Sequence, residues 1–439
     1  MSDRRLTREL GIAGATMLGL GSILGTGIFV SIGIAAGAAG PAVIIAIVRA
    51  AALATCNALS SAQLAASHPV SGGTYEYSYR LLHPILGFTA GWMFLCAKTA
   101  SAATAALGAA GYGLHLLGLD GAHSLPIIAA VTGVSLMLLV LAGLRRSSIT
   151  NVVIVSLTLL ALVAFAVAAM SQLTERGIRH FQPFFPDGES GSFGPLLHAT
   201  ALMFVAYTGY ARIATMSEEV VNPRVTIPRA IITTLVVSAL LYTIVAIAAI
   251  GTIGTDALAG LTTERATPLE AAAARLEVPG LTTLLAIGAV SAMLGVLLNL
   301  VLGLSRMVLA MGRRRDLPPV FGALTNDGVP RAAILIVGLS IAALALLGDV
   351  GTTWAFSAFT VLIYYAITNL AALRLPASER LYPRFISWTG LAGCLFLTPF
   401  VPARIWVAGL SLIAIGLGWR FAAHRLWPRR QEEGAAGNP

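Results

Sequence analysis

Long apolar stretches, separated by short polar loops, recur along the whole of the 439-residue chain. Most of them hold roughly 18–28 residues, which is the length that an α-helix needs to cross a bilayer. The pattern therefore predicts an all-α polytopic membrane protein with twelve transmembrane helices. The expected spans are 10–36, 41–66, 84–118, 125–144, 150–171, 195–217, 229–253, 280–311, 330–348, 352–373, 384–400 and 402–421.

The composition also indicates a membrane protein. Hydrophobic residues make up 57% of the chain and charged residues only 11%, whereas a soluble protein normally has about 25% charged residues. The first apolar run follows a basic start and resembles a secretion signal. Because that run holds about 27 residues, well beyond the roughly 7–15 of a signal core, we expect it to be a retained first span.

The basic residues are distributed unequally between the loops. With the N-terminus placed inside, 19 of the 28 lysines and arginines fall on the inner side, five fall outside, and four lie within spans. This bias predicts a multi-pass protein of the cell membrane with both termini cytoplasmic. The net charge of +9 thus reflects topology and attraction to anionic membrane lipid, and nucleic acid is not an expected partner.

A run of glycines interrupts the first predicted span, in the sequence GSILGTGIF at residues 21–29. Gly21, Gly25 and Gly27 each cost about 1 kcal/mol relative to alanine inside a helix. Two explanations fit this pattern. Either a neighbouring helix packs closely against the small residues, as in a GxxxG motif, or the helix is broken at this point.

A second interruption lies in the sixth predicted span, where Thr208 and Gly209 stand between Tyr207 and Tyr210. Spans one and six correspond if the chain is built as five plus five spans, and paired interruptions of this kind point to a transporter site. An unwound turn exposes backbone groups that lipid cannot satisfy, so protein or a polar solute must occupy it. Helix N-termini attract a carboxylate and free carbonyls accept from an ammonium, so a zwitterion is the expected solute.

Four motifs resemble those of the amino acid–polyamine–organocation (APC) superfamily of transporters. GLGSILGTGIF resembles its first helix, FVAYTGYARIATMSEEVVNPRVTIPRAI its sixth helix and the following loop, HPVSGGTYEYSY the loop after helix two, and LSRMVLAMGRRRDLPPVF the end of helix eight. The matches occur in the expected order over residues 10–330.

This resemblance implies the leucine-transporter fold, in which a five-plus-five inverted repeat has discontinuous helices 1 and 6 and is followed by two extra helices. It also implies alternating-access transport of amino acids or related amines. The implied divisions are an N-terminal tail at 1–9, a first repeat at 10–171, a second repeat at 195–373, the extra helices at 384–421 and a C-terminal tail at 422–439.

The resemblance also implies which residues form the site. The carboxylate maps to the backbone of the first break, and the amine to carbonyls of helix six; these residues are Ser22, Ile23, Leu24, Gly25, Thr26 and Gly27, and Phe204, Val205 and Ala206. Gly209 belongs to the second break. Tyr207 and Tyr210 are candidates for a side-chain pocket or gate, with aromatic packing between helices as the alternative.

The sequence departs from the family's ion-coupling patterns at two places. Some proton-coupled relatives carry a lysine in helix five, where this chain has Thr158. Sodium-coupled relatives supply adjacent hydroxyls from helix eight, where this chain has Leu294 and Gly295. A sodium site of the usual type is therefore not expected, although Thr158 and backbone carbonyls remain open as ligands. No cofactor is expected, and coupling to a proton gradient stays open.

Lys98, the only lysine of the chain, lies in the middle of the third predicted span. A lone charge near the bilayer centre costs at least about 2.5–3.5 kcal/mol and usually faces the bundle interior or a cavity. We hypothesise that Lys98 exchanges a proton during transport or holds the place of a coupling cation. The alternative is a fixed structural charge that binds helix-end carbonyls.

The distribution of charge within the spans bears on the substrate. No Asp or Glu falls in the middle of a predicted span, and Lys98 and Arg212 add positive charge. A cationic substrate would need a buried counter-charge, so neutral amino acids are the expected substrates and acidic ones stay open. Glu218 and Glu219, at the inner end of helix six, are either inner-gate partners of loop arginines or a solvated face.

Other function classes are weighed against transport. An ion-independent amino acid exchanger or facilitator is the main alternative, because it needs no coupling site. A non-transporting amino acid sensor is a second one, although the predicted tails are short for a signalling domain. An enzyme is not expected, because the chain has no HExxH, GxSxG, P-loop or GxGxxG motif. Protein partners stay open.

Overall fold

The computed structural model describes residues 11–68, 72–119, 123–144, 148–172, 175–185, 193–215 and 220–427. Every regular element in these ranges is a helix. Seven helices there are long and apolar enough to cross a membrane, with the run Thr26–Ser67 counted as one. Shorter apolar helices accompany them at Ile12–Ile23, Leu125–Leu141 and Arg331–Leu347. The chain thus has the helices of a polytopic membrane protein, as its hydropathy predicts.

The helices follow one another in a simple order. The first half holds α1 (Ile12–Ile23), α2 (Thr26–Phe29), α3 (Ser31–Ala39), η1 (Gly40–Ala42), α4 (Val43–Ser67), α5 (Thr74–Leu81), α6 (Pro84–Leu116), α7 (Leu125–Leu141), α8 (Ser148–Ser171) and α9 (Glu175–Arg179). The second half begins with α10 (Phe193–Tyr207), η2 (Thr208–Tyr210), α11 (Ala211–Thr215), α12 (Pro223–Ile253), α13 (Thr255–Arg265), α14 (Pro268–Ala274) and α15 (Leu281–Arg313). It continues with η3 (Pro319–Gly322), α16 (Arg331–Leu347), α17 (Val350–Leu373), η4 (Ala377–Glu379), α18 (Arg384–Leu397), η5 (Thr398–Phe400) and α19 (Ala403–Leu426).

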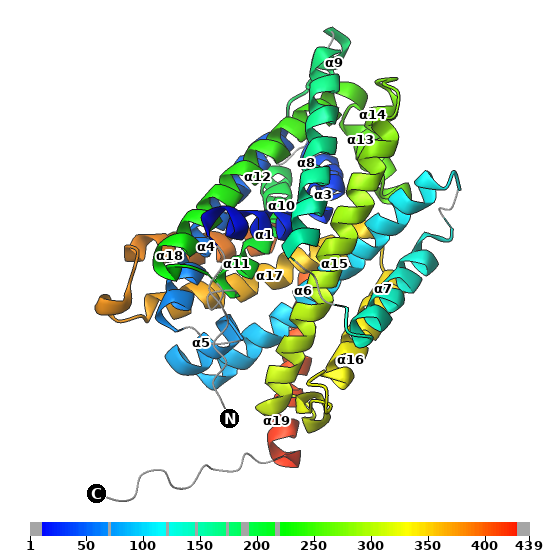
Figure 1. Ribbon diagram of the computed structural model, residues 1–439. Coiled ribbons are helices and arrows are strands. Elements are labelled where there is room, and N and C mark those ends of the chain that lie inside the picture. The colour runs from blue at the N-terminus through cyan, green and yellow to red at the C-terminus, as the bar shows by residue number, and fades with distance from the viewer. Residues whose placement is uncertain are drawn as a thin grey trace, which may run out of the picture.

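The two ends of the bundle carry different short helices (Figure 1). At one end, α9, α13 and α14 lie together, and we call it the α14 end. At the other, α5 lies near the last turns of α15 and α19, and we call it the α5 end. α5 lies beside one of the two cavities described below, and α13 and α14 lie beside the other.

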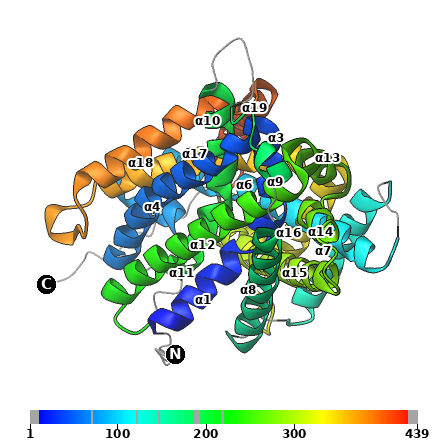
Figure 2. The same ribbon diagram turned by 90° about the horizontal axis from the view of Figure 1, so that it is seen from above.

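The centre of the bundle is built around α6, which packs against α15 and α17 and lies near the middle of the view in Figure 2. Residues 100–112 of α6 are all buried, and apart from Leu107 and Tyr112 they are only Ala, Gly, Ser and Thr. Small side chains allow helix backbones to approach closely where lipid offers no hydrophobic driving force. Between Ser101 and Gly111, each of which borders one of the cavities described below, the segment is packed closely against its neighbours.

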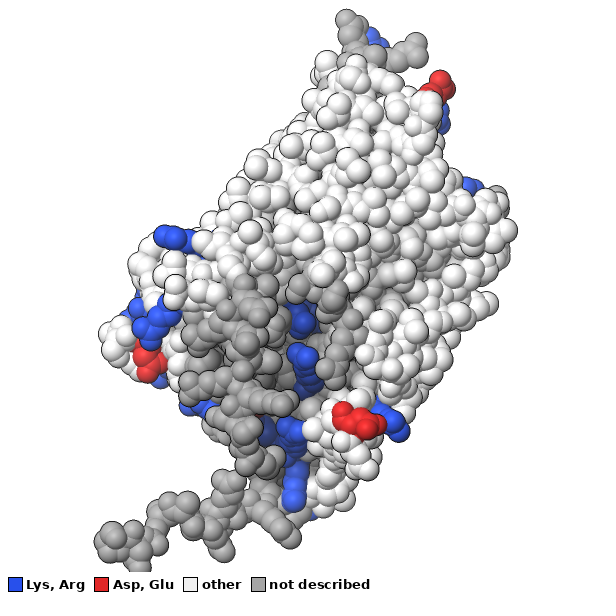
Figure 3. Space-filling model, viewed as in Figure 1, with Lys and Arg blue, Asp and Glu red and all other residues white. Residues whose placement is uncertain are grey.

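The outer faces of the peripheral helices are apolar. On α8 the exposed large side chains form one stripe, made up of Ile149, Val152, Val153, Leu160, Val163, Val167 and Met170. Figure 3 shows the same feature on a larger scale, since the upper part of this face is a broad area free of charged residues. Such a belt is what a helical protein presents to lipid.

The structure corrects the predicted loops. Residues 74–81, 175–179 and 254–279, which were expected to be loops, contain α5, α9, and α13 with α14. These helices are too short and too polar to show the pattern of a span, so hydropathy alone misses them. The tails and the pair Glu218 and Glu219 lie largely or wholly outside the described residues.

Candidate functional site

The first predicted break is present in the structure. α1 ends at Ile23, and the last backbone bond of its helical ladder runs from the Leu24 amide to the Leu20 carbonyl at 2.7 Å. After Gly25 the chain forms only the four residues of α2, and a second interruption at Val30 separates α2 from α3. The first span is therefore divided into three helical pieces.

The second break has a different form from the one predicted. An unwound turn was expected within 195–217, but α10 is followed by the 3₁₀ turn η2 and then directly by α11. The hydroxyl of Thr208 donates to the carbonyl of Val205 at 2.7 Å. Because the backbone hydrogen-bonding pattern changes at the 3₁₀ turn, this hydroxyl provides the carbonyl with a donor. A short 3₁₀ stretch inside a helix is common at functional hinges.

The two breaks are held together by Tyr242 of α12. Its buried hydroxyl lies 3.0 Å from the Ile23 carbonyl at the end of α1 and 3.3 Å from the Ala206 carbonyl at the end of α10. One hydroxyl proton is thus shared between the two helix ends. A Cβ added at Gly27 would lie 2.5 Å from this hydroxyl and 3.2 Å from the Ala206 Cα, so glycine is required for the approach.

A cavity of about 270 Å³ opens beside the two breaks. Eight of the residues predicted from the sequence line it, namely Ser22, Ile23, Thr26, Gly27, Lys98, Val205, Ala206 and Gly209. The cavity extends toward the α5 end, where Gly73, Tyr77 and Arg306 belong to its wall. The sequence therefore located the core of the cavity but not its full extent.

Six predicted residues do not line the cavity: Leu24, Gly25, Phe204, Tyr207, Tyr210 and Thr158. The Tyr207 hydroxyl donates to a carbonyl of α4 at 3.3 Å, and the Tyr210 ring lies 5.7 Å from the ring of Tyr365 in α17. Both tyrosines are fully buried. In this structure both side chains pack between helices.

Thr158 lies within α8, away from the residues that line the cavity. Its hydroxyl donates to the carbonyl of Ile154 in its own helix at 2.8 Å. Its backbone faces α15, since a Cβ added at Gly288 would lie 3.8 Å from the Thr158 Cα. In this arrangement the hydroxyl is occupied and packs between two helices.

Lys98 is brought to the second break. Its ammonium donates to the Thr208 hydroxyl at 2.7 Å, and that hydroxyl in turn donates to Val205. The side chain of Lys98 is 7% exposed and borders the cavity. A chain of two hydrogen bonds thus connects the middle of α6 to the end of α10.

The cavity wall is positively charged. Lys98, Arg212 and Arg306 belong to it, and within the described part of the chain it includes no aspartate or glutamate. Arg49, the fourth cation within the predicted spans, lies on an exposed face of α4 instead. Basic side chains attract a carboxylate and repel a cation.

Two polar groups in the wall lack partners. The Thr26 hydroxyl and the Asn299 amide nitrogen are buried and make no hydrogen bond within the part of the chain that the structure describes. Buried polar groups normally have partners, so these two are suited to receive a polar solute. Sequence reasoning identified Thr26 but missed Asn299, Trp354 and Phe94, because single polar or aromatic residues in other spans carry no local motif.

The wall at the α5 end is fixed by a buried carboxylate. Asp316, which is fully buried after α15, accepts hydrogen bonds from the hydroxyls of Tyr75 and Tyr79 on α5, the first at 2.6 Å. Arg420 of α19 lies 4.0 Å from the same carboxylate. Beside it, Glu76 forms an ion pair with Arg314, so α5 is tied firmly to the end of α15.

Comparisons with known proteins bear on what this cavity serves. The chain is 38% identical over 434 residues to an uncharacterized transporter of Mycobacterium tuberculosis, covering 99% of this chain and 95% of that protein. It is 29% identical to a branched-chain amino acid permease of Bacillus subtilis, covering 95% and 90%, and 26% identical to a methylthioribose transporter of the same organism, covering 94% and 93%.

A model of the amino acid permease family matches residues 14–425, which is nearly the whole chain and includes both helix breaks and the cavity between them. The family and these relatives are transporters rather than enzymes. The chain therefore belongs to the amino acid permease family of the APC superfamily, and it is a transporter.

Proposed function

We propose that the protein is a secondary active transporter that moves neutral amino acids across the cell membrane by alternating access. The observation that carries this proposal is the meeting of two broken helices at one cavity, where the Thr26 hydroxyl has no partner within the described chain. The backbone N–H groups of Thr26 and Gly27 at the start of α2 are proposed to bind the carboxylate, because the first N–H groups of a helix have no acceptor within it. The N–H groups of Ile28 and Phe29 already donate to Gly25.

The amino group of the substrate is proposed to bind near the end of α10. The Val205 and Ala206 carbonyls face this region, although Thr208 and Tyr242 already donate to them. A carbonyl oxygen has two lone pairs and accepts a second bond. A neutral side chain is favoured because the cavity wall holds three cations and, among the described residues, no carboxylate to balance a fourth.

The proposed topology has twelve spans, with a five-plus-five inverted repeat and both termini in the cytoplasm. The correspondence of the breaks in the first and sixth spans supports the repeat, and the excess of arginine in the predicted inner loops supports the orientation. On this topology the α5 end is cytoplasmic and the α14 end is outside, so the cavity beside the breaks extends toward the cytoplasm.

Proton coupling through Lys98 is proposed as the driving force. Lys98 is the one lysine of the chain, it borders the cavity, and its ammonium contacts the 3₁₀ turn through Thr208. Loss of its charge would change the hydrogen bonds at the second break, which is where the substrate is proposed to bind. Thr158 is retained as a second ion-coupling candidate on sequence grounds alone.

An ion-independent exchanger or facilitator and a non-transporting sensor are the alternatives. The deciding experiment uses the purified full-length protein in proteoliposomes, with labelled leucine, glutamate, lysine and methylthioribose as solutes. Each is tested under an imposed proton gradient, an imposed sodium gradient and no gradient. Protein-free liposomes provide the background.

Accumulation of leucine driven by the proton gradient supports the proposal. Counterflow of leucine without gradient-driven accumulation identifies an exchanger or facilitator instead, and binding without either identifies a sensor. Transport of methylthioribose in preference to every amino acid would replace the proposed substrate class.

A further inference from the structure

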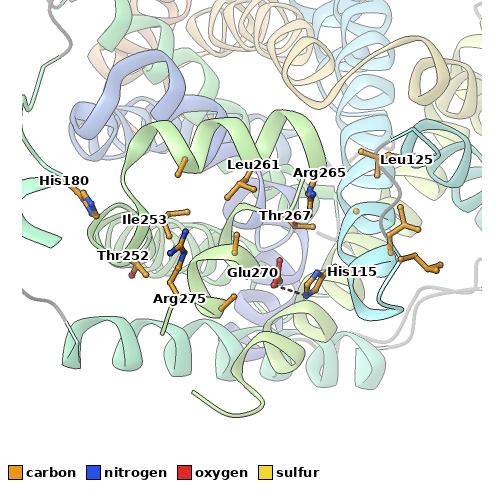
Figure 4. A pocket seen from close by; sticks show the side chains of 16 residues that line it. His115, Leu125, His180, Thr252, Ile253, Leu261, Arg265, Thr267, Glu270 and Arg275 are labelled. Carbon is orange, nitrogen blue, oxygen red and sulfur yellow. Dashed lines mark ion pairs between the residues drawn. The ribbon is translucent and has the colours of Figure 1, made fainter. Parts of the chain in front are cut away.

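A second cavity, of about 630 Å³, lies at the α14 end and is separate from the one beside the helix breaks (Figure 4). It is bordered by α6, α12, α13 and α14, and its charged and titratable lining residues are His115, His180, Arg265, Glu270 and Arg275. The buried segment 100–112 of α6 lies between Lys98 of the first cavity and His115 of the second. The two cavities share no lining residue.

An ion pair fastens α14 at this end of the bundle. The carboxylate of Glu270 lies 2.8 Å from the Nε2 atom of His115 at the end of α6, as the dashed line in Figure 4 marks. The Glu270 side chain is only 7% exposed, whereas that of His115 is 46% exposed. The pair thus joins a buried acid to a histidine that meets the surrounding solution.

The neighbouring residues make a second connection to the same helices. The backbone amide of Leu269 donates to the Tyr112 hydroxyl at 3.3 Å, and this hydroxyl donates to the Phe29 carbonyl at 3.1 Å. Tyr112 lies three residues before His115, so both contacts come from one face of α6. The position of α14 is thereby linked through Tyr112 to the end of α2, beside the first helix break.

We propose that His115 and Glu270 are positioning residues for transport, forming a latch that holds α14 against α6 and releases it on the outer side when the surrounding solution becomes acidic. The inference rests on the proposed alternating-access function, because a latch matters only if this end opens. The latch is then the outer gate of the proposed substrate site, and pH controls its opening.

The direction of the pH effect follows from the charges around the pair. Burial raises the pKa of Glu270, while the positive charges of His115 and Arg265 oppose that rise. The contact depends on the charged carboxylate of Glu270. As the pH falls through the raised pKa of Glu270, the carboxylate is neutralised and the pair is lost. His180 and Arg275 line the same cavity and complete its charged groups.

The test measures the distance between α6 and α13 by double electron–electron resonance in nanodiscs, without substrate. Spin labels are placed on cysteines at Leu117 and Glu264, which are both exposed, in a variant with Cys56, Cys96 and Cys394 replaced. The distance in the protein with both latch residues intact is compared with the distances in the Glu270→Gln and His115→Gln variants, at neutral and mildly acidic pH. Glu277→Gln is the matched control, because Glu277 is an exposed carboxylate of the same connection.

The expected result for the intact latch is one short distance at neutral pH and a longer population that grows about tenfold on acidification. Glu270→Gln and His115→Gln should show the longer population already at neutral pH, with little further change in acid, while Glu277→Gln behaves like the intact latch. A distance that does not depend on pH in the intact latch overturns the inference, as does full pH dependence in both latch variants. Because no substrate is present, either result leaves the leucine uptake assay to decide the proposed function separately.

Discussion

The carbonyl oxygen of Ser22 lies directly against Gly209, on the side where any other residue would carry its Cβ. A Cβ added at Gly209 would be 2.2 Å from this oxygen and 2.8 Å from the Ile23 side chain. The last turn of α1 and the 3₁₀ turn η2 are therefore in backbone contact. The two interruptions, 187 positions apart from Ser22 to Gly209 in the sequence, form one structural unit.

Replacing Gly209 by alanine should push the last turn of α1 and the 3₁₀ turn η2 apart. Because the overlap is with backbone rather than with a flexible side chain, we expect the free energy of unfolding to fall by about 1–3 kcal/mol. Leucine uptake should fall by about tenfold or more, since the groups proposed to bind substrate must keep their geometry. Thermal unfolding in detergent and initial uptake rates measure the two effects.

Gly113→Ala is the control for Gly209→Ala. Gly113 also lies within a helix, but nothing lies within 4 Å of an added Cβ there. Alanine favours a helix over glycine by about 1 kcal/mol, so this variant should be as stable as the original protein or more so. Equal stability and uptake for Gly209→Ala and Gly113→Ala would show that the contact with Ser22 is not needed.

Tyr242→Phe should weaken the junction without adding any atoms. The change removes the hydroxyl that serves both the Ile23 and the Ala206 carbonyl, and leaving buried acceptors without a partner costs about 1–3 kcal/mol. We expect a lower midpoint of thermal unfolding and slower uptake. The control is Tyr382→Phe, because Tyr382 is only half-buried, and this variant should unfold as the original protein does. Equal midpoints for the two variants would contradict the prediction.

The two interruptions could be predicted from the sequence because glycine and the Thr208–Gly209 pair mark them locally. The orientation of Tyr207 and Tyr210 could not. In a 3₁₀ turn, side chains three positions apart lie on the same face, and here that face points to α17 and α4, while Thr208 and Gly209 border the cavity. The prediction assumed an unwound turn, which has no regular faces, so it could not tell toward which helices the two tyrosine side chains point.

Contacts between distant spans also lay beyond sequence reasoning. Tyr242 is the single aromatic residue of its apolar helix, and Trp354 is one of several in α17. Only the folded packing brings their polar atoms to carbonyls of α1 and α10, with Trp354 donating to Leu202 at 2.9 Å. Asp316 is a comparable case, since it follows a run of three arginines in the sequence and the structure buries it completely. Such residues are recognised by their partners and not by their neighbours in the chain.

Asp316→Asn should destabilise the α5 end. The buried carboxylate accepts from two tyrosine hydroxyls, and hydrogen bonds to a charged group contribute about 1.5–3 kcal/mol each. We expect the free energy of unfolding to drop by about 2 kcal/mol or more. The control is Asp327→Asn, whose carboxylate is 77% exposed and lies 3.8 Å from Arg331, a surface pair worth about 0.5 kcal/mol or less. Denaturant titration of both variants measures the difference, and losses of equal size would refute the assignment.

Lys98→Gln should relax discrimination against cationic amino acids. With Lys98 intact, a second ammonium near Thr208 is repelled across a buried region where charges interact strongly. We expect the ratio of the inhibition constants of lysine and leucine to fall by about tenfold or more in the variant. The ratio is taken within one protein, so a lower overall activity does not obscure it. Arg306→Gln, which removes a cation farther from the breaks, should lower the ratio much less, and an unchanged ratio in Lys98→Gln would exclude a role in charge selection.

Lys98→Met tests the coupling proposal. If the Lys98 amine carries the coupled proton, leucine uptake by the original protein rises as the external pH falls, because acid supplies the co-transported proton. The variant cannot bind that proton, so we expect its uptake to become independent of pH and its accumulation under an imposed proton gradient to fall to the level of equilibration. Counterflow, which needs substrate on both sides but no net proton movement, should persist, and its rate measures how far the substrate site tolerates the change. Retention of the full pH dependence by Lys98→Met would assign coupling elsewhere and leave the ammonium as a fixed partner of Thr208.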